Sequence, residues 1–259
     1  MIEIAEFHIR ELEDMKKYPQ PLFFLGNRAL LKNKKISIIG SRKPNQYARH
    51  KTQELAQKLS SRGVCTVSGG AIGVDAIAHK SAGTQNTIMV AATGLDKHYP
   101  SINKNLITEI EDKGLVLSQF SEGSPSTRYN FVLRNELVVA LGEVLVVTYA
   151  DLNSGSMRSV EYALKMGKEI YVLPHRIGES EATNRLLQEG KAKAIYNIDT
   201  FVNEFAGKSK EKELVHDDFL EFCSLHPSYE EALQKYPSRV FEAELSGQIE
   251  IINGICKLL

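Results

Sequence analysis

The stretch "IIGSRKP" at residues 38–44 has the residue types of a phosphate-binding turn. It follows a short apolar run, and its glycine permits a tight turn that leads into a helix. Backbone N–H groups and the positive end of a helix attract a phosphate, and an arginine adds paired charge-assisted hydrogen bonds. We therefore predict an anion site at Gly40, Ser41, Arg42 and Lys43. The alternative is that Gly40 only turns the chain and that Arg42 is a solvated surface residue.

A second glycine-rich stretch, "VSGGAIGVDAIAH" at residues 67–79, repeats the pattern of strand, glycines and helix. It is not a G-x-G-x-x-G motif, and no acidic residue follows where a ribose hydroxyl would be held, so dinucleotide binding is only weakly indicated. The glycines still allow a ligand to come close to the backbone. The residues predicted to contact phosphate here are Ser68, Gly69, Gly70 and Gly73.

Asp75 and His79 lie four residues apart on the helix predicted to follow these glycines, so they share one face. That spacing suits a catalytic acid–base pair. It equally suits a carboxylate that orders the preceding loop and a histidine in an internal polar contact. We favour the second interpretation.

Aromatic and basic residues alternate in "STRYNFVLRNELV" at residues 126–138. Guanidinium groups bind phosphates and rings stack on bases, so this alternation is typical of single-strand recognition. The candidate residues are Arg128, Asn130, Phe131, Arg134 and Asn135. Phe131 could instead be buried beneath the helix that it begins.

Two further stretches follow predicted strands. "GLDKHYP" at residues 94–100 offers Tyr99, whose ring is either a base-stacking surface or a packing residue. "NSGSMRS" at residues 153–159 precedes a helix and offers Ser154, Gly155 and Ser156 as phosphate donors.

Several catalytic signatures are missing from the sequence. It contains no G-x-x-x-x-G-K-[ST], no H-E-x-x-H, no nucleophile elbow and no C-x-x-C. A motor, a hydrolase or a metal enzyme would be expected to show one of them. We therefore expect a non-catalytic protein with no cofactor and no metal.

These stretches need elements that bring them together. Apolar runs that predict strands occur at 35–40, 64–68, 87–92, 115–119, 143–150 and 169–174, and helical periodicity occurs at 47–62, 73–82, 103–113, 131–141 and 156–166. This alternation predicts an α/β fold with an extended, Rossmann-like, doubly wound and mainly parallel sheet. Ligands of such sheets bind at the carboxyl ends of the strands, where all five stretches would meet.

The remainder of the chain is divided by composition. We expect a short N-terminal extension at 1–34, the Rossmann-like domain at 35–207, a polar linker near 205–213 and a small helical, winged-helix-like domain at 214–259. Residues 208–259 carry ten acidic and six basic residues, a net charge of −4, which leaves +4 on residues 1–207. So slight an imbalance indicates a local binding cluster and no duplex-coating field.

The cellular setting is indicated by what the chain contains. Its three cysteines are widely spaced, which fits reduced thiols in the cytoplasm. The N-terminus lacks the continuous apolar region of a secretory signal, and no apolar stretch is long enough to span a membrane. We expect a cytoplasmic protein without a membrane association.

Taken in order, the blocks "GSRKP", "SGGAIGVDAIAH", "GLDKHYPSINKNL", "FVLRN", "SGSMRSVEYALKMGKEIYVLP" and "TNRLLQEGKA" resemble the DprA/Smf family of DNA-processing proteins across about residues 35–205. The resemblance implies a homodimer that binds single-stranded DNA, protects incoming DNA and helps to load a RecA-type recombinase in natural transformation. It also implies DNA contacts by Arg42 and Arg128. The sequence departs from the family pattern at Ile72, Gln119 and His175.

Two other functions remain open. A related Rossmann variant forms phosphoribohydrolases that act on purine mononucleotides, whose "PGGxGTxxE" loop is echoed here only by Gly155 and Glu161. The third possibility is a structural or signalling module whose ligand is a small phosphate compound.

Overall fold

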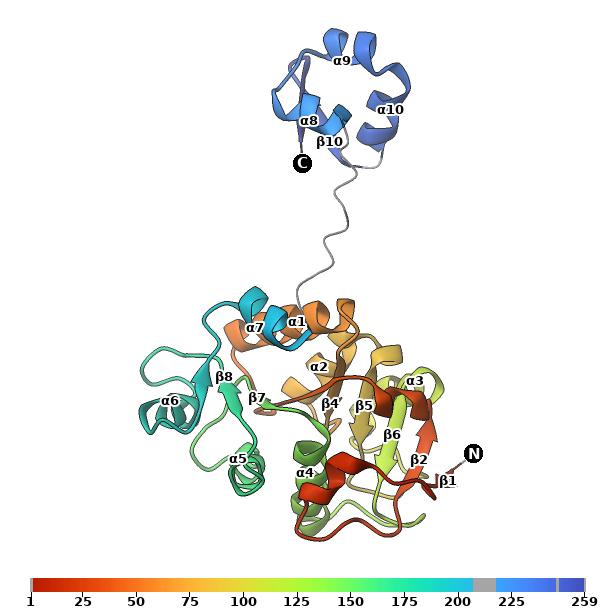
Figure 1. Cartoon of the computed structure of the whole chain (residues 1–259), viewed down its shortest axis with the longest axis vertical. Helices are drawn as coiled ribbons and strands as arrows, with labels where there is room; N and C mark the ends of the chain where they lie inside the picture. The colour runs from red at the N-terminus through yellow and green to blue at the C-terminus, as the bar shows by residue number, and fades with distance from the viewer. Residues whose placement is uncertain (1, 207–217, 246, 259) are drawn as a thin grey trace. The chain divides into compact units, whose positions relative to one another are not determined.

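The computed structural model describes residues 2–206, 218–245 and 247–258. The chain divides into two compact units, Met1–Gly207 and Lys208–Leu259, and each has its own core. Figure 1 shows the first unit as a layered α/β body and the second as a small, mainly helical one.

A nine-stranded sheet organises the first unit, in the order β1-β2-β6-β5-β4-β3-β7-β8-β9. The seven strands from β6 to β9 in this order run parallel, as predicted for a Rossmann-like fold. Six of these are the predicted strands: β3 (Lys35–Ile39), β4 (Cys65–Ser68), β5 (Thr87–Val90), β6 (Leu115–Ser118), β7 (Leu145–Val147) and β8 (Ile170–Val172). The seventh, β9 (Lys193–Ala194), is an edge strand of two residues.

Residues before Lys35 belong to the same sheet. The strand β2 (Phe23–Gly26) pairs antiparallel with β6, and β1 (Glu3–Ile4) pairs antiparallel with β2. Two 3₁₀ helices, η1 (Arg10–Asp14) and η2 (Arg28–Lys32), bury Leu12 and Leu30. The stretch expected as a short N-terminal extension therefore lies within the first unit and lengthens its sheet.

Helices cover both faces of the sheet. The remaining elements of this unit are α1 (Gln46–Ser61), α2 (Val74–Ala82), η3 (Thr84–Asn86), η4 (Ser101–Asn103), α3 (Lys104–Lys113), α4 (Arg128–Leu141), α5 (Ser156–Lys165), α6 (Glu181–Gln188) and α7 (Ile198–Ala206). One apolar cluster joins the sheet to α4, α5 and α6, and another joins it to α1, α2 and α7. The central strands β3 and β4 are buried along their whole length, including the polar residues Ser37, Thr66 and Ser68, because helices cover both faces of the sheet.

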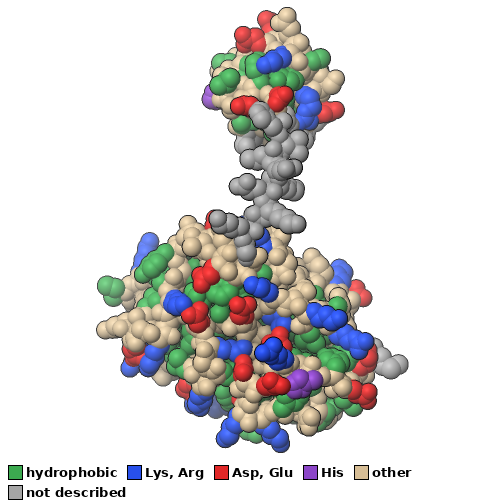
Figure 2. Space-filling view, viewed as in Figure 1, with side chains coloured by type: hydrophobic (Ala, Val, Ile, Leu, Met, Phe, Trp, Pro, Cys, Tyr) green, Lys and Arg blue, Asp and Glu red, His purple; other side chains and the backbone are tan. Residues whose placement is uncertain are grey.

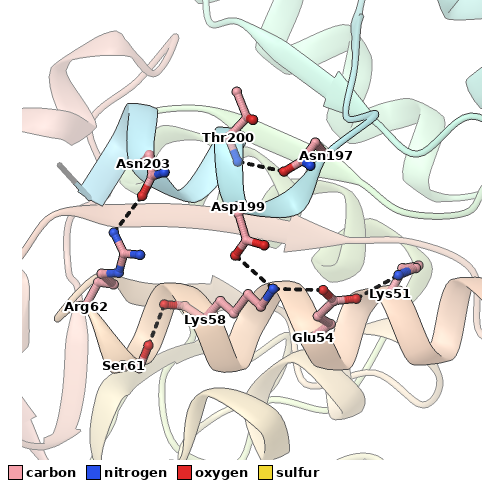
Figure 3. A network of polar contacts seen from close by, with 9 residues as sticks. All are labelled: Lys51, Glu54, Lys58, Ser61, Arg62, Asn197, Asp199, Thr200 and Asn203. Atoms are coloured by element: carbon pink, nitrogen blue, oxygen red, sulfur yellow. Dashed lines mark hydrogen bonds and ion pairs between the residues drawn. The ribbon is translucent and has the colours of Figure 1, made fainter. Parts of the chain in front are cut away.

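Helix α7 is held on α1 by an apolar face and a row of polar contacts. Phe201 and Phe205 pack against the ring of Tyr171, with centroids 5.0 and 5.4 Å from it. Figure 3 shows Lys58 between Glu54 and Asp199, at 3.0 and 2.8 Å. Phe205 and Ala206 are the last two residues of α7, so the prediction that the linker begins at Phe205 was two residues too early. The rest of that predicted linker lies outside the described residues.

The second unit contains α8 (Asp218–Ser224), α9 (Tyr229–Lys235), α10 (Pro237–Leu245) and a hairpin of β10 (Ile249–Ile252) and β11 (Ile255–Leu258). A capping box at Ser228 and Glu231 begins α9. Phe219, Cys223 and Val240 form part of its small core. The described part of this unit has three helices followed by a hairpin, and its assignment as a winged-helix-like domain stays a prediction.

Charged residues of both signs are spread over the first unit. Figure 2 shows basic and acidic side chains interspersed on the face in view. No described helix is long and apolar enough to cross a membrane. The three cysteines are buried, and no disulfide joins them in the described part of the chain.

Candidate functional site

A pocket of about 480 Å³ opens at the carboxyl ends of β3 and β7. These adjacent strands are joined to helices on opposite faces, so they form the switch point at which doubly wound sheets bind ligands. The pocket is lined by Ile39, Gly40, Ser41, Arg42, Lys43, Ala71, Asp75, Phe131, Arg134, Asn135, Asp151, Ser154, Gly155, Ser156 and Ser159.

The turn after β3 and the glycine loop after β4 have no room for side chains at Gly40 and Gly73. A Cβ at Gly40 would lie 2.7 Å from Val74 Cγ2, and one at Gly73 would lie 2.5 Å from the Ser41 carbonyl oxygen. Gly73 also has a φ of +82°, which favours glycine. The Ser41 N–H donates to the Tyr149 carbonyl at 2.8 Å and so fixes this turn against the end of β7. The turn is therefore held rigidly with Arg42 at its exposed tip.

Arg134 lies buried beneath the pocket, only 5% exposed. It occupies the space that a side chain at residue 69 would need, since a Cβ at Gly69 would fall 1.0 Å from Arg134 Nη1. That nitrogen lies 3.8 Å from Asp75 Oδ2, while Arg134 Nε has no hydrogen-bond partner among the described residues. A buried guanidinium with an unused donor is well suited to an anion that enters the pocket.

Burial sets the titration of this pair. Burial lowers the pKa of Arg134, and the Asp75 carboxylate opposes that shift. Burial likewise raises the pKa of Asp75, against the attraction of Arg134 and a hydrogen bond from the Ala71 N–H at 3.3 Å. A bound phosphate would supply the guanidinium with a second counter-charge.

Phe131 lies between two arginines. Its ring centroid is 5.6 Å from the Arg42 guanidinium carbon and 5.7 Å from that of Arg134. The Tyr99 ring lies beside it, at a centroid distance of 5.7 Å, and is 44% exposed. Cation–π attraction orients both guanidinium groups around one aromatic surface. The cluster thus offers charge for phosphates next to rings for bases.

The N-terminus of α5 forms the opposite wall of the pocket. Gly155 is its N-cap and Ser156 its first residue, so the positive end of the helix dipole lies at the pocket. The Ser154 hydroxyl is buried without a hydrogen-bond partner among the described residues. Both features favour an anionic ligand.

The structure brings most of the predicted residues together. Ten of them line the pocket, namely Gly40, Ser41, Arg42, Lys43, Phe131, Arg134, Asn135, Ser154, Gly155 and Ser156. Gly69 lines a smaller adjoining pocket with Tyr99. Helix α4 begins at Arg128, earlier than the predicted residue 131, because the Thr127 hydroxyl caps it by accepting from the Asn130 N–H.

The other predicted residues lie outside the lining. The Ser68 hydroxyl donates internally to the Ile38 carbonyl at 2.7 Å, and the Asn130 amide donates to the Pro125 carbonyl at 2.9 Å. Gly70 and Gly73 shape the glycine loop. Arg128 is exposed on the first turn of α4. Its contact with DNA stays a prediction.

Sequence reasoning missed some of the lining. Asp75 was interpreted only as a residue that orders the loop, and it also lies beside Arg134. Ser159 and Asp151 were not considered. Ser159 lies three residues after Ser156 on α5, so helical spacing was a signal that could have found it.

Asp75 and His79 do not form a catalytic pair. His79 is fully buried, and its Nδ1 lies 2.6 Å from the Thr87 hydroxyl, away from the pocket lining. Burial lowers the pKa of His79 to about 3. Among the described residues no cluster of metal-binding side chains occurs.

The chain matches the family described as DNA recombination-mediator protein A over residues 5–206. It belongs to this family. Its match covers the whole described part of the first unit apart from the first few residues, so the pocket lies within the family's shared domain. The chain accordingly has a DNA-processing, recombination-mediator role.

Individual relatives agree with that assignment. DNA processing protein DprA from Streptococcus pneumoniae is 34% identical over 200 residues, which cover 75% of this chain and 70% of the relative. Protein Smf from Escherichia coli is 32% identical over 191 residues, 72% of this chain and 51% of the relative. The chain thus spans about half the length of the Escherichia coli relative.

Two solved structures share the fold. One is DNA processing protein A from Helicobacter pylori, described for its single-stranded-DNA-binding mode, with a TM-score of 0.77 and 40% identity, covering 79% of this chain and 95% of the other. The other is DprA from Streptococcus pneumoniae, with a TM-score of 0.73 and 32% identity, covering 79% of this chain and 74% of the other. The family's Rossmann-like domain is therefore the fold of the first unit.

Proposed function

We propose that this chain binds single-stranded DNA in the pocket at the ends of β3 and β7. The observation that carries the proposal is the stack of Arg42, Phe131 and Arg134 opposite the N-terminus of α5. Charge on both walls binds the phosphate backbone, and the ring accepts a base face without regard to sequence. A duplex hides its base faces in stacking, so this site favours single strands.

The relatives support this ligand. The Helicobacter pylori protein, described as binding single-stranded DNA, shares 40% of its residues with this chain. The slight net charge of residues 1–207, +4, supports a local binding cluster for a single strand more than a broad positive surface for a duplex.

We further propose that the bound strand is protected and passed to a RecA-type recombinase during natural transformation, by a homodimer in the cytoplasm. The family's description as recombination mediators supports the hand-over to a recombinase. The acidic second unit suits a protein partner better than DNA, since its charge repels phosphates.

The phosphoribohydrolase alternative has little structural support. Glu161, the acid that echoed the motif of those enzymes, lies outside the pocket lining and pairs with Arg158 at 2.9 Å. Incubation with purine mononucleotides tests this directly, and sustained release of free base would overturn the non-catalytic assignment.

The Arg42→Ala variant tests the DNA-binding proposal. Loss of a charge-assisted phosphate contact should weaken binding of a labelled oligothymidylate about ten-fold at moderate salt. The slope of log affinity against log salt should become shallower by about 0.7. Fluorescence anisotropy over a salt series measures both.

Lys165→Ala is the matched control. Lys165 is an exposed cation in the last turn of α5, at the other end of the helix from the pocket. It should bind like the unaltered chain. Equal affinity and salt slope for Arg42→Ala and the unaltered chain would rule out this site.

A further inference from the structure

A cluster of rings at the ends of β7 and β8 lies on the opposite side of the pocket from Tyr99. The His175 ring meets the Tyr47 ring at a centroid distance of 5.3 Å and the Tyr149 ring at 5.1 Å, nearly perpendicular to both. None of the three rings lines the pocket itself. They were not among the residues that the sequence singled out for DNA contact.

The cluster is fixed in place by hydrogen bonds. His175 Nε2 lies 2.8 Å from the Thr148 carbonyl oxygen, so it donates there. The side chain of Asn184 makes two hydrogen bonds to the backbone of His175. Its Oδ1 accepts from the His175 N–H and its Nδ2 donates to the His175 carbonyl, both at 3.1 Å. Tyr47 stands in the first turn of α1, whose N-cap Asn45 also donates to Glu179 at 3.0 Å. The ring of Tyr47 is therefore presented by a rigid support.

Tyr47 is nevertheless open to solvent. It is 43% exposed, close to the 44% of Tyr99, and its hydroxyl has no hydrogen-bond partner among the described residues. Two exposed cations flank the cluster along the chain, Lys43 before α1 and Arg176 directly after His175, and neither has an ion-pair partner in the described part of the chain. An ordered, exposed ring beside unpaired cations is the arrangement that stacks a base and holds its phosphate.

The order of the strands places Tyr99 on one side of the pocket and the ring cluster that includes Tyr47 on the other. Tyr99 follows β5, the pocket turn follows β3, and Tyr149 and His175 follow β7 and β8. Four steps of ~4.8 Å separate β5 from β8, or about 19 Å along the rim of the sheet. An extended single strand of a few nucleotides spans that distance.

We infer that Tyr47, supported by His175 and Tyr149, is a second base-stacking surface that extends the single-stranded-DNA site beyond the pocket toward β8. The inference rests on the proposed function. It adds that the bound strand runs along the rim of the sheet from the pocket toward β8. Asp151, an exposed acid of the pocket lining, repels phosphates, so we expect the backbone of the strand to follow the cations Lys43 and Arg176 instead.

The absence of tryptophan from the sequence allows a direct test. Tyr47→Trp introduces a single tryptophan, whose fluorescence a stacked base quenches. Titration with oligothymidylate should quench it at saturation. Leu164→Trp is the matched control, because Leu164 is similarly exposed, at 45%, but lies near the C-terminal end of α5. Its fluorescence should not change.

Affinity gives an independent readout. Tyr47→Ala should weaken binding of long oligothymidylates about ten-fold, and Tyr47→Phe should restore it because stacking needs only the ring. Oligonucleotides too short to reach from the pocket to Tyr47 should bind the unaltered chain, Tyr47→Ala and Tyr47→Phe with equal affinity. Circular dichroism confirms that each variant is folded.

The outcomes separate the two proposals. If the tryptophan of the Tyr47→Trp variant is not quenched while a labelled oligonucleotide binds with unchanged affinity, the stacking surface is refuted and the pocket proposal stands. If the unaltered chain fails to bind the labelled oligonucleotide, both are refuted.

Discussion

His79 shows how burial makes one side chain sensitive to pH. Its ring has no hydrogen-bond partner at Nε2 among the described residues, and burial lowers its pKa from 6.5 to about 3. The unfolded chain therefore takes up a proton below pH 6.5 that the folded chain refuses until about pH 3. Stability from this residue is complete above pH 6.5 and is lost as the pH falls toward 3.

We expect the free energy of unfolding to fall by about 2 kcal/mol between pH 7 and pH 5 on account of His79. Urea denaturation at the two values measures the fall, and His79→Asn should remove most of it. The control is His50→Asn, since His50 is exposed on α1 and should leave the pH dependence as it is. If the free energy of unfolding of His79→Asn fell as much between pH 7 and pH 5 as that of the unaltered chain, His79 would not be the cause of the pH dependence.

At the same scale, the sequence predicted residue types better than their surroundings. Arg42 and Phe131 were identified by type and spacing, and they do lie together. The burial of Arg134 was not predictable, because it depends on space that Gly69, a residue far away in the chain, leaves open. Tyr47 was identified only as part of a helix. The contact of its ring with His175, which follows β8, depends on the tertiary structure and is not visible in the local sequence.

Among the elements, α7 depends on apolar packing more than on its polar contacts. Phe201 is 3% exposed, so Phe201→Ala should cost about 3–5 kcal/mol of unfolding free energy. Asp199 is exposed, and Asp199→Ala should cost less than about 1 kcal/mol, although Figure 3 shows it at the centre of the network. Chemical denaturation of both variants makes the comparison, and a larger loss for Asp199→Ala would reverse our interpretation.

The strands and helices of the parallel sheet were predictable from their sequence patterns. Each of the six predicted strands is rich in apolar residues and is followed by a turn or loop, and the ends of the five predicted helices agreed within a few residues. The strands β1, β2 and β9 were missed. The first and last are two residues long, and β2 pairs antiparallel with β6 at a long sequence separation, which local periodicity does not report. Helices α6 and α7 were not among the predicted helices.

For the whole molecule, separate cores imply separate folding. The clusters of the first unit contain no residue of the second, and the second has its own. We expect a fragment of residues 1–206 to unfold in one cooperative transition and to bind oligothymidylate as tightly as the full chain. Thermal circular dichroism and anisotropy test this. A fragment that folds but binds weakly would assign part of the DNA site to residues beyond 206.

The two outermost strands of the nine-stranded sheet limit the ways in which copies of this chain can associate through the edges of that sheet. Glu3–Ile4 and Lys193–Ala194 are the outermost strands, and each offers only two residues of unpaired backbone. Edges this short give a neighbouring chain almost nothing to extend, so the sheet resists growth into a continuous intermolecular sheet or fibril. Two first units that associate should therefore do so through helices or loops, and the large sheet is protected from one common route to aggregation.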